Sequence, residues 1–237
     1  MKRAMDIILS SIAIILLSPL LLPLVIILKL TGEGEIFYIQ PRVGKDGQLF
    51  GLIKFATMLK DSPNLPGGTI TAANDPRVLP LGRFLRKTKL NELPQLLNIL
   101  KGEMSIVGPR PLTPDCFAAY PTEMQKEIKT MRPGLTGIGS IVFRDEEAIT
   151  AGSNKTVYET YCEDVMPYKG SLEVWYKHHQ SIWIDLLLIL TTAWVIFFPN
   201  TRFYEKFFKK LPERPASLRV NLGVDQAELG QSSSLQS

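Results

Sequence analysis

The feature that most limits how this chain can fold is an uncharged apolar stretch from Ile7 to Leu28. As an α-helix this stretch would extend roughly 33 Å, about the thickness of the hydrocarbon core of a bilayer. Lys2 and Arg3 precede it, as in the basic start of a secretory signal peptide. The stretch is too long for a signal peptide, however, and no small-x-small cleavage site follows it. The sequence therefore predicts a segment inserted in a membrane.

Two prolines, Pro19 and Pro23, lie in the middle of this stretch. Pro19 lacks a backbone N–H, and its ring clashes with the carbonyl of Ile15 in a regular helix. We therefore expect a bend, with the Ser18 hydroxyl available to a backbone group that the bend frees.

Cations flank both ends of the apolar stretch, with Lys2 and Arg3 before it and Lys29 and Arg42 after it. The positive-inside rule then favours a cytoplasmic position for both ends. These features alone leave two arrangements open: a re-entrant hairpin that returns to the face it entered, and a kinked helix that spans the bilayer.

The remainder of the chain mixes strand and helix patterns. Beta-branched and aromatic residues on both sides of Gly44–Gly47 predict a hairpin over 34–58. A long loop rich in Pro, Gly and Asn follows over 61–82, and short helices are predicted for 82–90 and 92–102. We also expect one helix over 114–132, a strand or two over 135–147, and a helix over 154–180 interrupted at Pro167. The fold class predicted is α+β.

A second apolar stretch, Ser181–Pro199, carries Asp185 near its start and two tryptophans, Trp183 and Trp194. Aromatic residues of this kind favour a helix lying in the membrane interface, although a spanning or a core helix stays open. The polar, Ser- and Gln-rich end from Pro212 to Ser237 is predicted to be disordered.

The formal net charge of +4 suits anionic partners such as lipid headgroups or phosphorylated substrates. Nucleic acid is the weakest candidate because no binding motif is present. The two cysteines, Cys116 and Cys162, match no metal or redox spacing and are predicted to be free thiols. The adjacent His178 and His179 diverge on a helix and make a poor metal pair.

A basic cluster leads into the predicted helix that starts near Asn91, the expected N-cap. Helix N-termini attract anions, so the cluster could bind phosphate, although a solvated helix face explains such a run equally well. Glu92 could hold Mg²⁺ against a phosphate, or could merely stabilise the first turn of its own helix. The cluster consists of Arg83, Arg86, Lys87 and Lys89.

Three more cations are candidates for the same site. Arg110 is held between two prolines in Gly108–Pro111, which limits the conformations of an arginine suited to bidentate phosphate binding. Lys54 ends a predicted strand, and Arg77 follows a turn at Asn74. An ordinary surface role is the alternative for each of them.

Taken together, the motifs "QPRVG", "KFATM", "NDPR", "GRFLRKTKLNELPQLLNILKGEMSIVGPRP" and "PGLTG", after an apolar start containing "SP", resemble one known family. It is the bacterial sugar transferase family, the small monotopic polyprenyl-phosphate phosphoglycosyl transferases. The resemblance extends over roughly residues 2–192, and the segment 82–111 is the most specific part.

The resemblance implies an enzyme that moves a sugar 1-phosphate from a UDP-sugar to undecaprenyl phosphate, releases UMP and needs Mg²⁺. It also implies a re-entrant N-terminal helix broken at Ser18 and Pro19. The family's catalytic unit is an Asp-Glu pair at a helix start. Its Asp attacks the β-phosphate of the donor, and its Glu, matched here by Glu92, helps to bind the metal.

The chain departs from the family pattern at the attacking residue, where it has Asn91. An amide is a very weak nucleophile. Direct in-line transfer, a different nucleophile, and an inactive chain are therefore all open. Two further departures are Ala56, where the family usually has Arg, and Glu173, where it often has Asp; both put the family's nucleotide contacts at these positions in doubt.

We thus predict a monotopic α+β protein on the cytoplasmic face of a bacterial inner membrane. It would have a re-entrant hairpin over 1–30, a catalytic domain with interfacial helices over 31–211 and a disordered tail over 212–237. Homo-oligomers are an open expectation, and nothing selects the sugar. The alternative is an inactive membrane-anchored scaffold that binds nucleotide sugar and lipid. The predicted site has Asn91 and Glu92 at its centre, with Glu92 on Mg²⁺, and its substrate-binding residues are Lys54, Arg77, Arg83, Arg86, Arg110 and Glu173.

Overall fold

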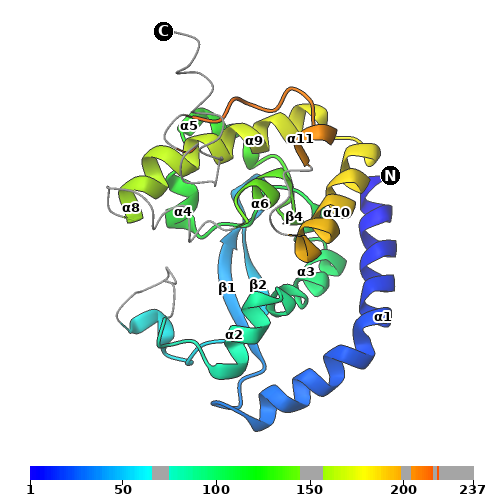
Figure 1. Cartoon of the computed structure of the whole chain (residues 1–237), viewed down its shortest axis with the longest axis vertical. Helices are drawn as coiled ribbons and strands as arrows, with labels where there is room; N and C mark the ends of the chain where they lie inside the picture. The colour runs from blue at the N-terminus through cyan, green and yellow to red at the C-terminus, as the bar shows by residue number, and fades with distance from the viewer. Residues whose placement is uncertain (66–74, 145–156, 199–203, 216–217, 219–237) are drawn as a thin grey trace, which may run out of the picture.

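The computed structural model of this chain describes residues 1–65, 75–144, 157–198, 204–215 and 218 (Figure 1). Within these ranges, helices surround two small two-stranded sheets, and one long helix runs along the side of the molecule. The predicted α+β class is confirmed. The membrane topology of the long helix belongs to the proposal below.

The long helix α1 (Lys2–Leu30) contains both prolines, and Figure 1 shows that it bends in its middle. The bend has a local cause, because Pro19 cannot donate to the carbonyl of Ile15. The Ser18 hydroxyl donates to that carbonyl instead, at 2.8 Å, as expected from the sequence. Within the described residues, α1 is the one helix long and apolar enough to cross a membrane.

The first turns of α1 are fastened to the rest of the protein by polar contacts. Arg3 donates to the carbonyls of Ile99 (2.5 Å) and Leu100 (2.8 Å), near the end of a neighbouring helix. The buried Asp6 accepts from the hydroxyl of Ser105 and the N–H of Ile106, both at 3.0 Å. The charges that flank the predicted membrane segment in the sequence therefore also have a structural role.

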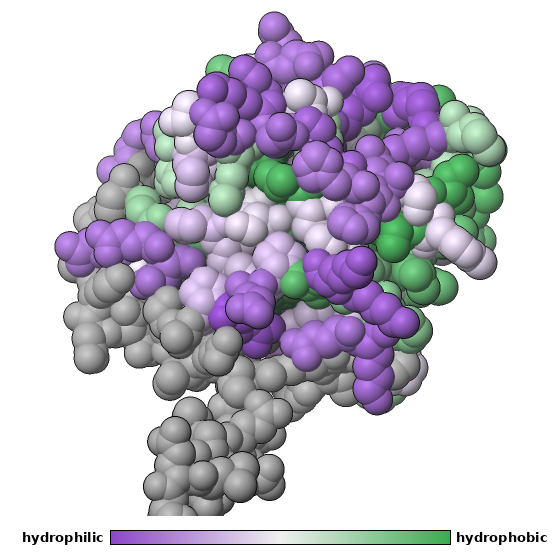
Figure 2. Space-filling model, turned by 90° about the horizontal axis from the view of Figure 1, so that it is seen from above, coloured by the Kyte–Doolittle hydropathy of each residue, from purple (hydrophilic) through white to green (hydrophobic). Residues whose placement is uncertain are grey.

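Many large apolar side chains of α1 remain exposed. Figure 2 shows apolar surface gathered on the side where α1 and α10 (Ile182–Phe197) lie in Figure 1. A contiguous apolar surface of this kind is typical of contact with a membrane or another protein. The exposed residues of α1 include Ile7, Ile8, Ile12, Ile15, Leu16, Leu20, Leu22, Ile26, Ile27 and Leu30.

The predicted hairpin is present. Strands β1 (Phe37–Val43) and β2 (Leu49–Phe55) pair antiparallel, and Lys54 lies opposite Tyr38. The short helix η1 (Lys45–Gly47) makes the turn.

The predicted pair of short helices follows as α2 (Pro80–Lys87) and α3 (Gln95–Lys101), with the 3-10 turn η3 (Leu90–Glu92) between them. Asn91 lies inside η3 and makes no side-chain cap, so the prediction of an Asn91 N-cap is wrong. The left-handed Lys89 (φ 60°) reverses the chain before η3, and Pro94 occupies the N-cap position of α3 without a side-chain cap. The tight turn ahead of Pro94 displaces the helix start beyond Asn91.

After α3, strand β3 (Ser105–Val107) pairs in parallel with β4 (Gly134–Thr136). The segment between them holds two helices, α4 (Pro114–Ala118) and α5 (Thr122–Ile128), where one was predicted. Pro121 explains the break, since the residue before a proline avoids helical backbone angles. The strand predicted after β4 is replaced by helix α6 (Ile138–Val142).

The last part of the described chain is helical. Helix α8 (Val157–Thr160), the π-helical η4 (Tyr161–Val165) and α9 (Met166–His179) follow one another directly. Pro167 lies in the first turn of α9, so the interruption expected there occurs one turn earlier as the π-helix. Short elements η2 (Ser62–Asn64) and α11 (Tyr204–Phe207) complete the described chain.

The main core joins α3, β3, α6, α9 and α10. Each of its four helices contributes a fully buried side chain, namely Ile99, Ile138, Leu172 and Leu188. Leu218 packs into the same cluster. At the start of the predicted tail, the carbonyl of Pro212 accepts from the Tyr168 hydroxyl at 3.3 Å. Most of that tail, 216–217 and 219–237, lies outside the described residues. The core thus holds α9 and the segments after α3 and β3 in fixed relative positions.

Candidate active site

Glu92 is the centre of an ion cluster assembled from three separate segments. Its Oε1 lies 3.1 Å from Lys54 Nζ on β2 and 3.2 Å from an Nη2 of Arg110, which follows β3. The Glu92 side chain is 14% exposed, and that of Arg110 is 34% exposed. The cluster is therefore sheltered but reachable from solvent, as a site for a charged ligand must be.

The position of Lys54 relative to Glu92 depends on a buried amide. Asn98, fully buried on α3, accepts from the N–H of Ile53 at 3.0 Å and donates to the carbonyl of Gly51 at 2.8 Å. These bonds attach the helix that follows Glu92 to the strand that carries Lys54. A single side chain thus fixes two parts of the cluster.

The position of Arg110 depends on a close approach between two backbones. A Cβ on Gly108 would lie 2.4 Å from the carbonyl oxygen of Arg132, so only glycine fits beside the start of β4. The adjacent prolines Pro109 and Pro111 are buried, which restrains the loop further. The predicted presentation of Arg110 by a rigid turn agrees with this geometry.

The charges of the cluster keep Glu92 ionised. Burial opposes ionisation, but Lys54, Arg110 and Lys89 outweigh it and hold the pKa of the Glu92 carboxyl well below its usual range. Burial lowers the pKa of Lys54 to about 8, against the attraction of Glu92. An excess of cations around one carboxylate is an arrangement that attracts phosphate.

Asn91, next to Glu92, is 7% exposed, and its amide Oδ1 is buried with no hydrogen-bond partner among the described residues. An unpaired buried acceptor costs about 1–3 kcal/mol, so a ligand atom that binds it recovers that free energy. Oxygen donors of this kind suit Mg²⁺, which takes one or two carboxylates and completes its shell with substrate oxygens and water. The Glu92 carboxylate is therefore a suitable ligand for the predicted metal. Within the described ranges, no three His, Cys, Asp or Glu side chains cluster as a complete metal site.

Glu173, on α9, is fully buried next to the Arg110 loop. Burial raises the pKa of its carboxyl to about 8, while Lys169 and the backbone N–H of Arg110 oppose the shift. Neither oxygen of the Glu173 carboxylate accepts a hydrogen bond that meets the usual distance and angle limits from the described residues. A Cβ on Gly139 would lie 2.3 Å from its Oε1, so Gly139 provides the space that this side chain occupies.

The other predicted arginines have different surroundings. Arg77 is buried and binds Asp75 through both Nε (2.9 Å) and Nη2 (2.6 Å). Arg83 is exposed on α2, and Arg86 places Nη1 3.7 Å from the sulfur of Met58. Of the predicted phosphate-binding cations, Lys54 and Arg110 are the two in ion-pair distance of Glu92, and substrate roles for the others stay predictions.

One cation near the cluster was not among the predicted site residues. Arg42 on β1 donates to the carbonyl of Pro111 at 3.3 Å and to Gln40 at 2.5 Å, and its charge contributes to the lowered pKa of Lys54. The sequence feature that could have indicated Arg42 is its place in the "QPRVG" motif. That motif lies in β1, which pairs with β2, the strand that carries Lys54.

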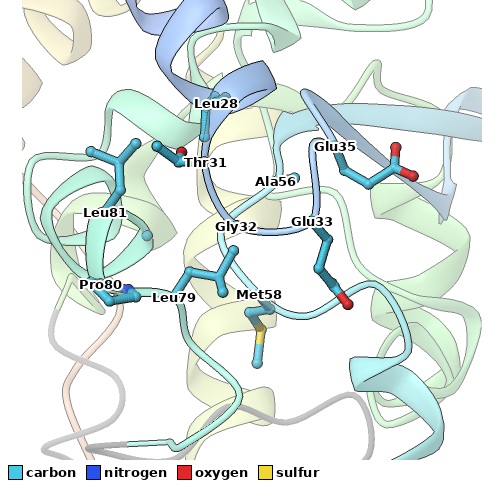
Figure 3. Close-up of a pocket in the computed structure, with 11 residues that line it drawn as sticks. Leu28, Thr31, Gly32, Glu33, Glu35, Ala56, Met58, Leu79, Pro80 and Leu81 are labelled. Carbon is cyan, nitrogen blue, oxygen red and sulfur yellow. The ribbon is translucent and has the colours of Figure 1, made fainter.

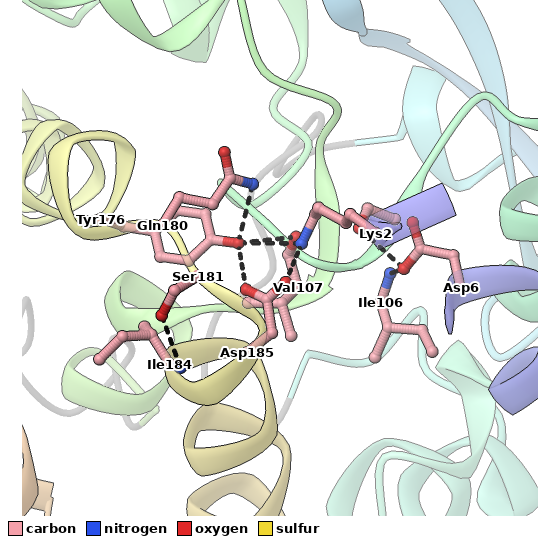
Figure 4. A network of polar contacts seen from close by, with 10 residues as sticks. Lys2, Asp6, Ile106, Val107, Tyr176, Gln180, Ser181, Ile184 and Asp185 are labelled. Carbon is pink, nitrogen blue, oxygen red and sulfur yellow. Dashed lines mark hydrogen bonds and ion pairs between the residues drawn. The ribbon is translucent and has the colours of Figure 1, made fainter. Parts of the chain in front are cut away.

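Asp185 was expected at a helix start or an interface. It is in the first turn of α10 but is 1% exposed, and it accepts from Lys2 Nζ at 2.6 Å and from the Tyr176 hydroxyl at 2.6 Å (Figure 4). Gln180 donates to the same hydroxyl at 3.3 Å. This network joins the first turn of α1 to α9 and α10.

The fold and the ion cluster together define an α+β protein with a long apolar helix and a sheltered cationic site suited to phosphate. The family model described as "Bacterial sugar transferase" matches residues 1–199. The chain belongs to the bacterial sugar transferase family, which confirms the family predicted from the motifs.

Three relatives illustrate the similarity. The exopolysaccharide production protein ExoY of Rhizobium meliloti is 34% identical over 205 residues, which are 81% of this chain and 83% of the relative. The undecaprenyl-phosphate galactose phosphotransferase of Salmonella typhimurium is 34% identical over 211 residues, 83% of this chain and 40% of the relative. The UDP-glucose:undecaprenyl-phosphate glucose-1-phosphate transferase of Escherichia coli is 33% identical over 200 residues, 81% of this chain and 39% of the relative. The chain therefore spans about two fifths of the latter two proteins.

Proposed function

We propose that this protein transfers a sugar 1-phosphate from a UDP-sugar to undecaprenyl phosphate, with release of UMP, as the first membrane step in making a bacterial surface glycan. The names of the relatives from Salmonella and Escherichia coli support this class of reaction. The observation that carries the proposal is the Glu92 carboxylate between Lys54 and Arg110. Two phosphate-bearing substrates need cations that are already positioned, and this cluster supplies them.

The proposed location is the cytoplasmic face of the inner membrane. The exposed apolar residues of α1 would enter the bilayer, and its bend supports the re-entrant arrangement, with both ends on one face. Exposed Trp183 and Trp194 on α10 suit the interface. A site at this depth meets a soluble donor and a lipid acceptor without extracting the lipid. A tag before Met1 and a tag after Leu30 should then be labelled from the same side in sealed vesicles, and labelling from opposite sides would refute the hairpin.

In the proposed reaction, Lys54 and Arg110 bind the phosphate oxygens of the donor and offset the charge that develops on them. Mg²⁺, when bound by Glu92, would neutralise further phosphate charge. Asn91 has no ionisable oxygen, so we propose that the acceptor phosphate attacks the β-phosphorus directly. The new bond joins that oxygen to the β-phosphorus, the bond from the β-phosphorus to the bridging oxygen breaks, and UMP leaves with the α-phosphate.

The test is UMP release from a panel of UDP-sugars with undecaprenyl phosphate in detergent or nanodiscs, with and without Mg²⁺. We expect UMP from at least one sugar and a loss of about 100-fold or more for Glu92→Gln, since it removes a charge at the reacting centre. Glu123→Gln, on the exposed surface of α5, is the matched control and should retain activity.

The Asn91→Asp variant separates the remaining possibilities. If the chain as it stands releases no UMP from any sugar and Asn91→Asp does, the proposed activity is refuted for this sequence. UDP-sugar binding measured on the same protein would then distinguish a scaffold from a chain that has lost both functions.

A further inference from the structure

A cavity of about 290 Å³ lies where the end of α1 meets the end of β2 and the start of α2 (Figure 3). Its wall is mainly apolar. The residues that carry the following argument are Leu28, Ala56, Met58, Leu79 and Leu81.

Two carboxylates also line the cavity, but both have partners. Glu35 forms an ion pair with Lys60 Nζ at 2.7 Å, and Glu33 accepts from the backbone N–H of Lys60. In Figure 3 their side chains lie on the side away from Leu28 and Leu81. The leucine side of the cavity is therefore free to take an apolar ligand.

The cavity adjoins the apolar surface of the long helix. Leu28 belongs to the last turn of α1, where Ile26, Ile27 and Leu30 are exposed at 59%, 45% and 80%. Leu28 itself is 4% exposed, so the cavity lies on the inner side of a helix turn whose outer side is apolar and exposed. A cavity this near to exposed apolar surface favours a lipid tail over a soluble apolar molecule.

The cavity also adjoins the cationic site. Ala56 follows Lys54 by two residues, and side chains at this spacing in extended backbone lie on the same side, about 7 Å apart. Arg86 reaches Met58 from α2, with Nη1 3.7 Å from the sulfur. An apolar cavity beside cations complements a molecule with an anionic head and an apolar tail.

We propose that this cavity binds the phosphate-proximal isoprenoid units of the polyprenyl phosphate acceptor. The inference rests on the proposed function and adds the location of the acceptor's tail. Ligand pockets typically measure about 300–1,000 Å³, so a cavity at the lower end holds a short part of the chain and leaves the rest in the bilayer.

The first test fills the cavity. Ala56→Leu adds apolar volume inside it, and Ala118→Leu, at an exposed position of α4, is the matched control. Each methylene excluded from apolar contact weakens binding by roughly fourfold, so we expect KM for polyprenyl phosphate to rise about tenfold or more. KM for the UDP-sugar should change by less than KM for the acceptor, since the proposal places the tail of the acceptor in the cavity. An unchanged KM for the acceptor in a folded Ala56→Leu protein would overturn the proposal.

The second test measures binding without turnover. A farnesyl phosphate probe with a diazirine on its first isoprene unit should label peptides around residues 56–58 and 79–82, and label them less in Ala56→Leu than in Ala118→Leu. Leu79→Phe narrows the cavity from the opposite wall and replaces Ala56→Leu if that variant fails to fold. Reduced labelling without any UMP release would retain the acceptor site and refute the proposed function. UMP release with the same labelling in both variants would retain the proposed function and refute the acceptor site. Equal competition by phosphatidic acid would overturn the assignment to a polyprenyl chain.

Discussion

The ion pair between Lys2 and Asp185 allows a prediction in which the size of the stability loss depends on which partner is removed. Asp185 is 1% exposed and Lys2 is 28% exposed, and the two charged atoms are 2.6 Å apart. Burial raises the pKa of the Tyr176 hydroxyl, so it stays protonated and donates to Asp185 (Figure 4). Lys2→Met therefore leaves a buried carboxylate with one neutral donor, whereas Asp185→Asn leaves a lysine that can turn to water.

The two variants should differ in stability by a measurable amount. An uncompensated buried charge costs about 3–5 kcal/mol, and the Tyr176 hydrogen bond places Lys2→Met near the lower figure. Asp185→Asn keeps a partner for Tyr176 and loses about 1 kcal/mol, as expected for one partly exposed pair. For a chain of this length, 1 kcal/mol shifts Tm by about 2–4 °C. We therefore expect Tm to fall by about 6–12 °C for Lys2→Met and about 2–4 °C for Asp185→Asn.

Thermal unfolding in one lipid nanodisc preparation, followed by tryptophan fluorescence, measures both shifts. Lys45→Met removes a lysine from an exposed pair with Asp46 at 3.8 Å and should change Tm little. Equal losses for Lys2→Met and Asp185→Asn, or a larger loss for Asp185→Asn, would refute the reasoning from burial.

Three further predictions concern the surroundings of the cluster. Burial raises the pKa of Glu173 from 4.5 to about 8. Between these two pH values the folded protein keeps a proton on Glu173 that the unfolded chain loses. The free energy of unfolding therefore falls as pH rises through this range. Glu173→Gln should weaken this fall in thermal melts between about pH 5 and 8; an identical slope would contradict it. Asn98→Ala leaves the N–H of Ile53 unpaired, and it should lower the free energy of denaturant unfolding by about 2 kcal/mol and also lower kcat. Unchanged stability and kcat would mean that a water replaces the amide, and would contradict this role of Asn98. Gly139→Ala should destabilise by about 1–3 kcal/mol through its clash with Glu173, and Glu173→Asp should rescue it in a double-mutant cycle; no rescue would place the clash elsewhere.

The candidate site was partly predictable because its residues occur in motifs with local meaning. Proline on both sides of Arg110 and the acidic residue in the turn before α3 indicate a rigid loop and a helix start. Arg77 was not separable from these by sequence, since its bond to Asp75 depends on a turn geometry that a one-dimensional pattern does not determine. Asn91 is the opposite case: its residue type indicated a helix cap, and the tight turn at η3 gave it a different environment.

The long apolar helix, its bend, the α+β class and the family follow from the sequence by itself, because hydrophobic length, proline chemistry and dense local motifs act over short distances. Only the tertiary structure decided that Lys54, Glu92 and Arg110 meet, that Lys2 pairs with Asp185 and that a cavity forms at the end of α1. Those contacts join segments up to 183 residues apart. They arise from the packing of the core around buried groups such as Asn98, and no local pattern encodes such distances.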